Sequence, residues 1–181
     1  MNTNITTSLL LAAALGFTAC QKKEAQSATD TAPAAVENPE LQKFLLAEKP
    51  ADPVNVSTLF AQPDPGREVT VRGLVMGKMQ VFVDSRAMFV IGDDTKLTHC
   101  AAMEDDHCET PWDVCCEDPD DIKKAIATVQ LTDADGTPLK SSLKGLAGLK
   151  ELSEVTLTGT LAPGSNAENL VINATGLHIQ P

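Results

Sequence analysis

The chain has 181 residues, with 25 acidic side chains against 14 lysines and arginines and a formal net charge of −11. Hydrophobic residues make up 43% of the chain, which is enough to bury a core and argues against wholesale disorder. There is one tryptophan, five phenylalanines and no tyrosine. Binding of single-stranded nucleic acid needs clustered cations and aromatic rings on which bases stack, so this composition argues against a nucleic-acid partner.

The N-terminal residues form an export signal. An apolar stretch over 9–15 is followed by small residues, and it is too short to span a membrane. Ala19 followed by Cys20 at the end of this stretch resembles the lipobox of bacterial lipoproteins. The resemblance implies a signal peptide over 1–19, lipidation of Cys20 and a membrane-anchored protein of the cell envelope that faces the periplasm. By the same family analogy, Gln21 implies the outer membrane. An ordinary cleaved signal peptide and an uncleaved anchor are the alternatives.

Two segments separate this signal from the main folded part. Residues 20–39 are polar, rich in alanine and proline and without any period, which predicts a flexible tether. Residues 40–65 form a lead-in segment with short helical turns over 41–46 and 56–62, separated by proline-containing turns. We expect the folded domain to cover residues 66–181.

Alternating apolar and polar residues predict five strands in this domain. In the first, Val69, Val71, Gly73 and Val75 alternate with polar or outward-facing residues. The other strands are expected within 80–94, 123–139, 153–161 and 170–179. Between the third and the fourth, leucines three residues apart over 141–152 predict an amphipathic helix.

The order of three strands, a helix and two strands is similar to that of the OB-fold. The resemblance covers about residues 66–180 and implies a mainly β protein: a five-stranded OB-type Greek-key barrel with one helix between strands three and four. A cysteine-rich insertion over 98–121 lies between strands two and three. More narrowly, the chain resembles small exported bacterial OB-type (tRNA_anti-like) proteins, a group largely without assigned function. A generic β-sandwich is the alternative.

The insertion, which contains HCAAMEDDHCETPWDVCC, holds the cysteines that remain once Cys20 is assigned to lipid. An even number of cysteines in an oxidising compartment favours disulfides. A bond between adjacent cysteines would strain their shared peptide, so we expect each neighbour to pair with one of the two earlier cysteines. A charged loop has little to bury, and each closed loop would contribute on the order of 2–3 kcal/mol. We expect Trp112 to cover the sulfur atoms. The predicted disulfide residues are Cys100, Cys108, Cys115 and Cys116.

The same residues support an alternative, a metal site for zinc or copper that adds His99 and His107 as ligands. Copper would also recruit Met103 and, less readily, Met76 and Met79. The gaps of seven, six and zero residues between the cysteines differ from the close ligand pairs of structural zinc sites, which favours the disulfides.

Thiol catalysis is disfavoured by charge. Nine acidic residues and no lysine or arginine lie between Glu104 and Asp121, and negative neighbours suppress the reactive thiolate. The same acidity offers a calcium site as an alternative to a merely solvated loop, and we favour the solvated loop. The candidate calcium ligands are Asp113, Glu117, Asp118, Asp120 and Asp121.

No known catalytic motif is present, and His178 on the last strand is expected to be an outward-facing polar residue. The sequence therefore predicts a non-enzymatic protein with no cofactor. We expect an OB-type binding or interaction module, anchored to the membrane through lipidated Cys20, that binds an envelope protein or a small ligand. A zinc- or copper-binding protein is the alternative function.

Overall fold

The computed structural model describes residues 38–104 and 107–180. The predicted signal peptide, the predicted lipidation site Cys20 and nearly all of the predicted tether lie outside the described residues. No helix within the described residues is long and apolar enough to cross a membrane.

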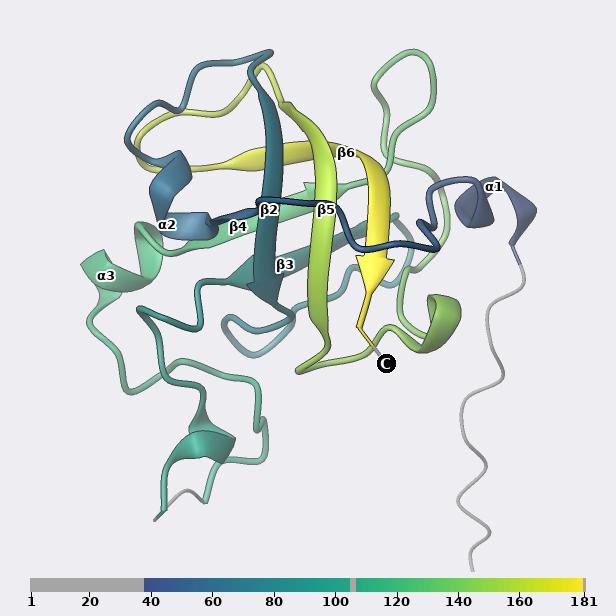
Figure 1. Cartoon of the computed structure of the whole chain (residues 1–181). Helices are drawn as coiled ribbons and strands as arrows, with labels where there is room; N and C mark the ends of the chain where they lie inside the picture. The colour runs from purple at the N-terminus through teal and green to yellow at the C-terminus, as the bar shows by residue number, and fades with distance from the viewer. Residues whose placement is uncertain (1–37, 105–106, 181) are drawn as a thin grey trace, which may run out of the picture. The chain divides into compact units, whose positions relative to one another are not determined.

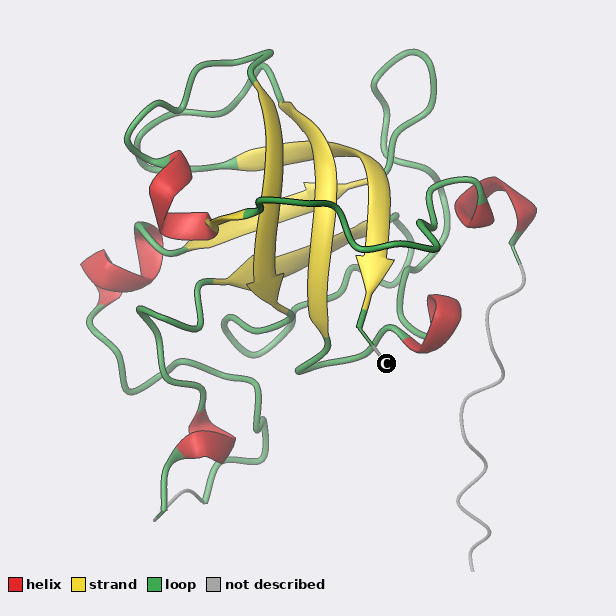
Figure 2. Cartoon of the chain, viewed as in Figure 1, coloured by secondary structure: helices red, strands yellow, loops and turns green. Residues whose placement is uncertain are grey.

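The protein is mainly β, and five strands close into a barrel (Figures 1 and 2). Hydrogen bonding follows the order β2-β3-β4-β6-β5, and β5 pairs again with β2. The β4–β6 pair is parallel, while the other pairs of the barrel are antiparallel. The strands are β2 (Glu68–Leu74), β3 (Met88–Gly92), β4 (Ile126–Gln130), β5 (Glu154–Leu161) and β6 (Val171–Ile179).

The period-2 pattern of the sequence is reproduced in the barrel wall. Val69, Val71 and Gly73 of β2 are buried, and they alternate with exposed or half-buried neighbours as predicted. The same alternation holds in β5, although Thr156 is buried as well. A bulge between Thr158 and Gly159 of β5 brings this strand very close to β6. A Cβ atom on Gly159 would lie 2.3 Å from the backbone oxygen of Asn173, so only glycine fits there.

The lead-in segment packs against the barrel. It contains α1 (Pro39–Gln42), the short strand β1 (Val54–Asn55) and α2 (Val56–Leu59). β1 pairs in parallel with Val71 and Arg72 of β2, and β2 shares only the Leu74–Gly92 pair with β3. Leu41, Val56 and Leu59 of this segment are buried in the main core.

The prediction of a helix over 141–152 is wrong. The structure has only the 3₁₀ turn η2 (Leu146–Gly148) there, although the leucines expected on one stripe are buried at 143, 146 and 149. Gly145 and Gly148 have φ values of +90° and +84°, and Ala147 and Leu152 are also left-handed. An α-helix requires a right-handed backbone at every residue, so the leucines reach the core through successive turns instead.

A buried carboxylate joins the end of β3 to α2. Asp93 is 1% exposed and accepts hydrogen bonds from the backbone N–H and the hydroxyl of both Ser57 and Thr95, at 2.5–3.0 Å. Burial alone would raise the pKa of Asp93, but the hydrogen bonds from Ser57 and Thr95 outweigh burial and hold the pKa below its ordinary value. The charged form of Asp93 therefore stabilises this junction.

Candidate metal centre

The four cysteines of the insertion lie between β3 and β4, on a segment that projects from one end of the barrel (Figure 1). Two short helices belong to this segment: the 3₁₀ helix η1 (Cys100–Ala102) and α3 (Pro119–Lys123). The side chain of Asp118 accepts a hydrogen bond from the N–H of Asp120 at 2.8 Å and so caps α3.

An apolar cluster of its own supports the segment. Its buried members are Met76, Leu97, Val114, Ile122 and Ala125. Trp112 contacts both this cluster and the main core, and so links the two. Of these five residues only Val114 lies within the predicted insertion 98–121, so the charged segment is anchored mainly by apolar residues that flank it.

Backbone hydrogen bonds fix the position of the cysteines on this cluster. Residues 111–114 lie between the chain after β2 and the helix η1. On one side, the N–H of Val114 donates to the carbonyl of Gly77 at 3.0 Å, and the N–H of Gly77 donates to Trp112 at 3.2 Å. On the other, the N–H of Cys100 donates to the carbonyl of Asp113 at 2.8 Å. A further bond at 2.7 Å runs from the N–H of Thr98 to the carboxylate of Glu117.

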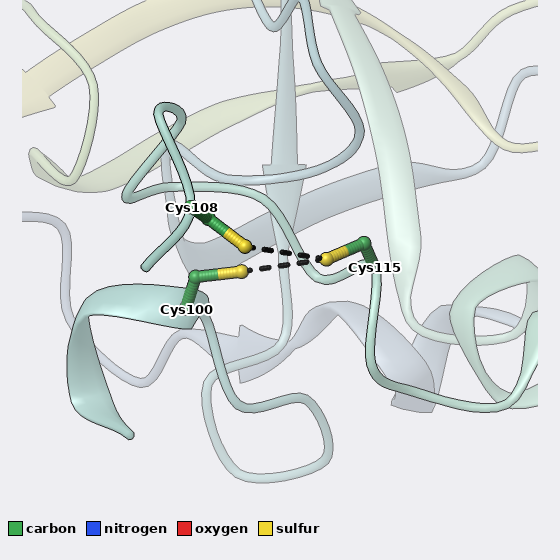
Figure 3. Close-up of side chains that lie close together, drawn as sticks. All are labelled: Cys100, Cys108 and Cys115. Carbon is green, nitrogen blue, oxygen red and sulfur yellow. Dashed lines mark hydrogen bonds between the residues drawn. The ribbon is translucent and has the colours of Figure 1, made fainter. Parts of the chain in front are cut away.

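The sulfur atoms of three cysteines converge (Figure 3). The Sγ of Cys115 lies 3.5 Å from that of Cys100 and 3.8 Å from that of Cys108. All three sulfurs lie within 4.8 Å of one another. Cys100 is buried, Cys108 is half-buried and Cys115 is exposed, so the group extends from the interior of the segment to its surface.

These separations differ from those of a disulfide, in which the sulfurs lie about 2.05 Å apart. A tetrahedral zinc ion with bonds of about 2.3 Å to sulfur places its ligand sulfurs about 3.8 Å apart. The observed separations of 3.5 and 3.8 Å are close to this value, and they also fit S–H···S hydrogen bonds. The sequence predicted disulfide pairs, but the sulfurs of Cys115 and of Cys100 and Cys108 lie too far apart for a disulfide bond.

The other predicted ligands lie around this group of three. The Sγ of Cys116 is 3.9 Å from that of Cys115, but Cys116 is exposed and is not one of the three mutually close sulfurs. His99 is half-buried, and its Nδ1 is buried without a hydrogen-bond partner among the described residues. His107 is exposed. Met103 is half-buried on the same loop.

Asp113 has a structural role that its place among the calcium candidates did not suggest. It is 5% exposed, and its Oδ2 accepts a hydrogen bond from the N–H of Met79 at 3.1 Å. Its Oδ1 is buried and has no partner within the described part of the chain. Trp112, expected over the sulfur atoms, donates its indole N–H to the carbonyl of Met79 at 3.2 Å. Two side chains of the cysteine segment therefore hold the backbone of Met79.

The remaining residues named from the sequence lie outside the group of three cysteines. Of the two methionines named as less ready copper ligands, Met76 is buried and Met79 is exposed. Asp120 forms an ion pair of 3.1 Å with Lys123 on α3. His178 lies on β6, half-buried and opposite Thr156 of β5.

Comparisons with protein-family models, with curated proteins and with solved structures each found no match for this chain.

Proposed function

We propose that this protein binds a thiophilic metal ion, zinc or copper, through the thiolates of Cys100, Cys108 and Cys115. The convergence of these three sulfurs within 4.8 Å carries the proposal. Thiolate sulfur is a soft ligand that selects copper(I) and zinc among the metals available to a cell. The fourth position of a tetrahedral zinc ion would be taken by a solvent molecule.

The surroundings of the site support a cation. Three thiolates carry three negative charges, and the segment from Glu104 to Asp121 adds nine carboxylates with no lysine or arginine. A bound cation relieves this repulsion, whereas a catalytic thiolate would gain no such relief. The apolar cluster around Val114 and the hydrogen bonds of Cys100 hold the ligands in place before the metal arrives.

The barrel supports the OB-type assignment made from the sequence. A five-stranded closed barrel, in which the first strand pairs with the fourth and the third pairs in parallel with the last, fits this class. The cysteine segment enters between the second and third barrel strands. On this proposal the barrel is a non-enzymatic scaffold, tethered by lipid on Cys20 to the periplasmic face of the envelope, and its insertion carries the metal.

A disulfide-stapled interaction module is the second candidate. The 3.5 Å between the sulfurs of Cys100 and Cys115 favours it, because a small rotation about χ1 would bring these two atoms to bonding distance. The sulfur of Cys115 also lies 3.8 Å from that of Cys108 and 3.9 Å from that of Cys116, however, and it can bond only one of the three. A shared metal ion would be bound by Cys115 together with both Cys100 and Cys108. We therefore propose metal binding ahead of a disulfide.

Metal content and thiol accessibility separate the two functions. The full chain, purified with reductant and incubated with zinc, should hold one metal ion per chain by native mass spectrometry. The variant Cys115→Ser should lose it, while the matched variant Cys116→Ser should keep it. A metal-free protein whose cysteines react with an alkylating agent only after reduction would reject the metal site in favour of the staple.

A further inference from the structure

A pocket of about 340 Å³ opens beside the cysteine group. One wall is the chain that follows β2, and the other is the chain from Asp113 into α3. Cys115 lines it and is the sulfur that lies close to both Cys100 and Cys108. The pocket is lined by, among others, Lys78, Met79, Asp113, Cys115 and Glu117.

Met79 stands out in this pocket because it is 75% exposed, although methionine is an apolar residue. Met76, three residues earlier, is completely buried in the cluster beneath the site. The exposure of Met79 does not come from a loose backbone. Its N–H donates to Asp113 at 3.1 Å, and its carbonyl accepts from Trp112 at 3.2 Å. The cysteine segment itself thus holds the backbone of Met79 beside the pocket, and the exposed side chain lines it.

Thioether sulfur is a neutral, soft ligand. It binds copper(I) and silver(I) well, and it competes poorly with water for zinc. The carboxylates of Asp113 and Glu117 line the same pocket and favour a cation there, against the single positive charge of Lys78. The pocket therefore combines a soft first ligand, a negative wall and an exposed thiol.

We infer that this pocket is the route by which a soft monovalent ion of the copper(I) class reaches the three-cysteine centre, with Met79 as its first ligand. The inference rests on the proposed function and specifies its metal. The ion passes from the thioether of Met79 to the sulfur of Cys115 and then to all three thiolates. Each thiol that becomes a ligand releases its proton to water, and the oxidation state of the metal does not change.

The rate of metal transfer tests the inference. Copper(I) would be supplied, without oxygen, as a complex with a weaker coloured chelator, and its transfer to the reduced full chain followed by stopped-flow absorbance. Met79→Leu should slow the transfer roughly tenfold, the low end of what loss of a supporting group costs at metal sites. The final affinity should stay the same, since Met79 is not a ligand of the filled centre.

Two controls test whether the slower transfer is specific to Met79 and to copper(I). Met103→Leu changes a methionine on the cysteine loop that does not line the pocket, and it should transfer copper(I) at the wild-type rate. Zinc uptake by Met79→Leu should also be unchanged. Equal rates for Met79→Leu and wild type, equal slowing by Met103→Leu, or slowed zinc uptake would each overturn the inference. A wild-type chain that binds neither metal at equilibrium would instead reject the proposed function.

Discussion

Val114 lies next to Cys115 and is completely buried in the apolar cluster beneath the proposed metal site. The change Val114→Ala removes two methyl groups, worth about 0.8 kcal/mol each in transfer free energy. The cavity that remains adds to this cost, so we expect the free energy of unfolding to fall by about 2–3 kcal/mol. Because this cluster anchors the cysteine segment, the lost stability should mainly loosen the arrangement of the three cysteines. A local loss of 2 kcal/mol would weaken metal binding by at most about 25-fold, and we expect at least threefold.

Val129 on β4 provides the matched control. It is also a completely buried valine, but it belongs to the main core of the barrel. Urea denaturation should show a similar loss of stability for Val129→Ala, whereas competition titration of zinc should show wild-type affinity. If Val114→Ala leaves zinc affinity unchanged, or if Val129→Ala weakens it as much, the cluster does not organise the site.

Three further predictions concern the fold and the ligand set. The charged form of Asp93 stabilises the junction of β3 and α2, so acid titration should lower the free energy of unfolding as the pH falls through the lowered pKa of Asp93, and Asp93→Asn should flatten this dependence. Gly159→Ala would place a Cβ atom 2.3 Å from the backbone oxygen of Asn173, and thermal denaturation should show a strongly destabilised barrel; an unchanged melting temperature would contradict the close approach. His99→Ala and His107→Ala should each still bind one zinc ion by mass spectrometry, because neither histidine belongs to the group of three sulfurs; loss of the ion from either variant would add that residue to the ligand set.

The strands of the barrel could be predicted because burial on one face of a sheet leaves a period of two in the sequence. Val69, Val71 and Gly73 show that period, and so do Val155 and Leu157. The predicted helix after β4 failed for a local reason. Its leucines have helical spacing and are buried, but Gly145 and Gly148 adopt left-handed conformations that no spacing argument detects.

The arrangement of the cysteines could not be predicted from their spacing. Gaps of seven, six and zero residues do not match a zinc motif, and this argued for disulfides. The sulfurs meet because Asp113 pairs with Gly77, more than thirty residues away, and because Val114 and Met76 share one apolar cluster. These contacts depend on tertiary structure. Only Val114 of this cluster lies within the acidic run from Glu104 to Asp121, so the segment resembled a solvated loop.

X-ray absorption spectroscopy of the zinc-loaded full chain tests the central claim most directly, because it counts the sulfur atoms bound to the metal. Shared coordination by Cys100, Cys108 and Cys115 predicts at least three sulfur neighbours at about 2.3 Å. A zinc ion surrounded only by oxygen and nitrogen, or a chain that takes up no zinc after full reduction, would contradict it.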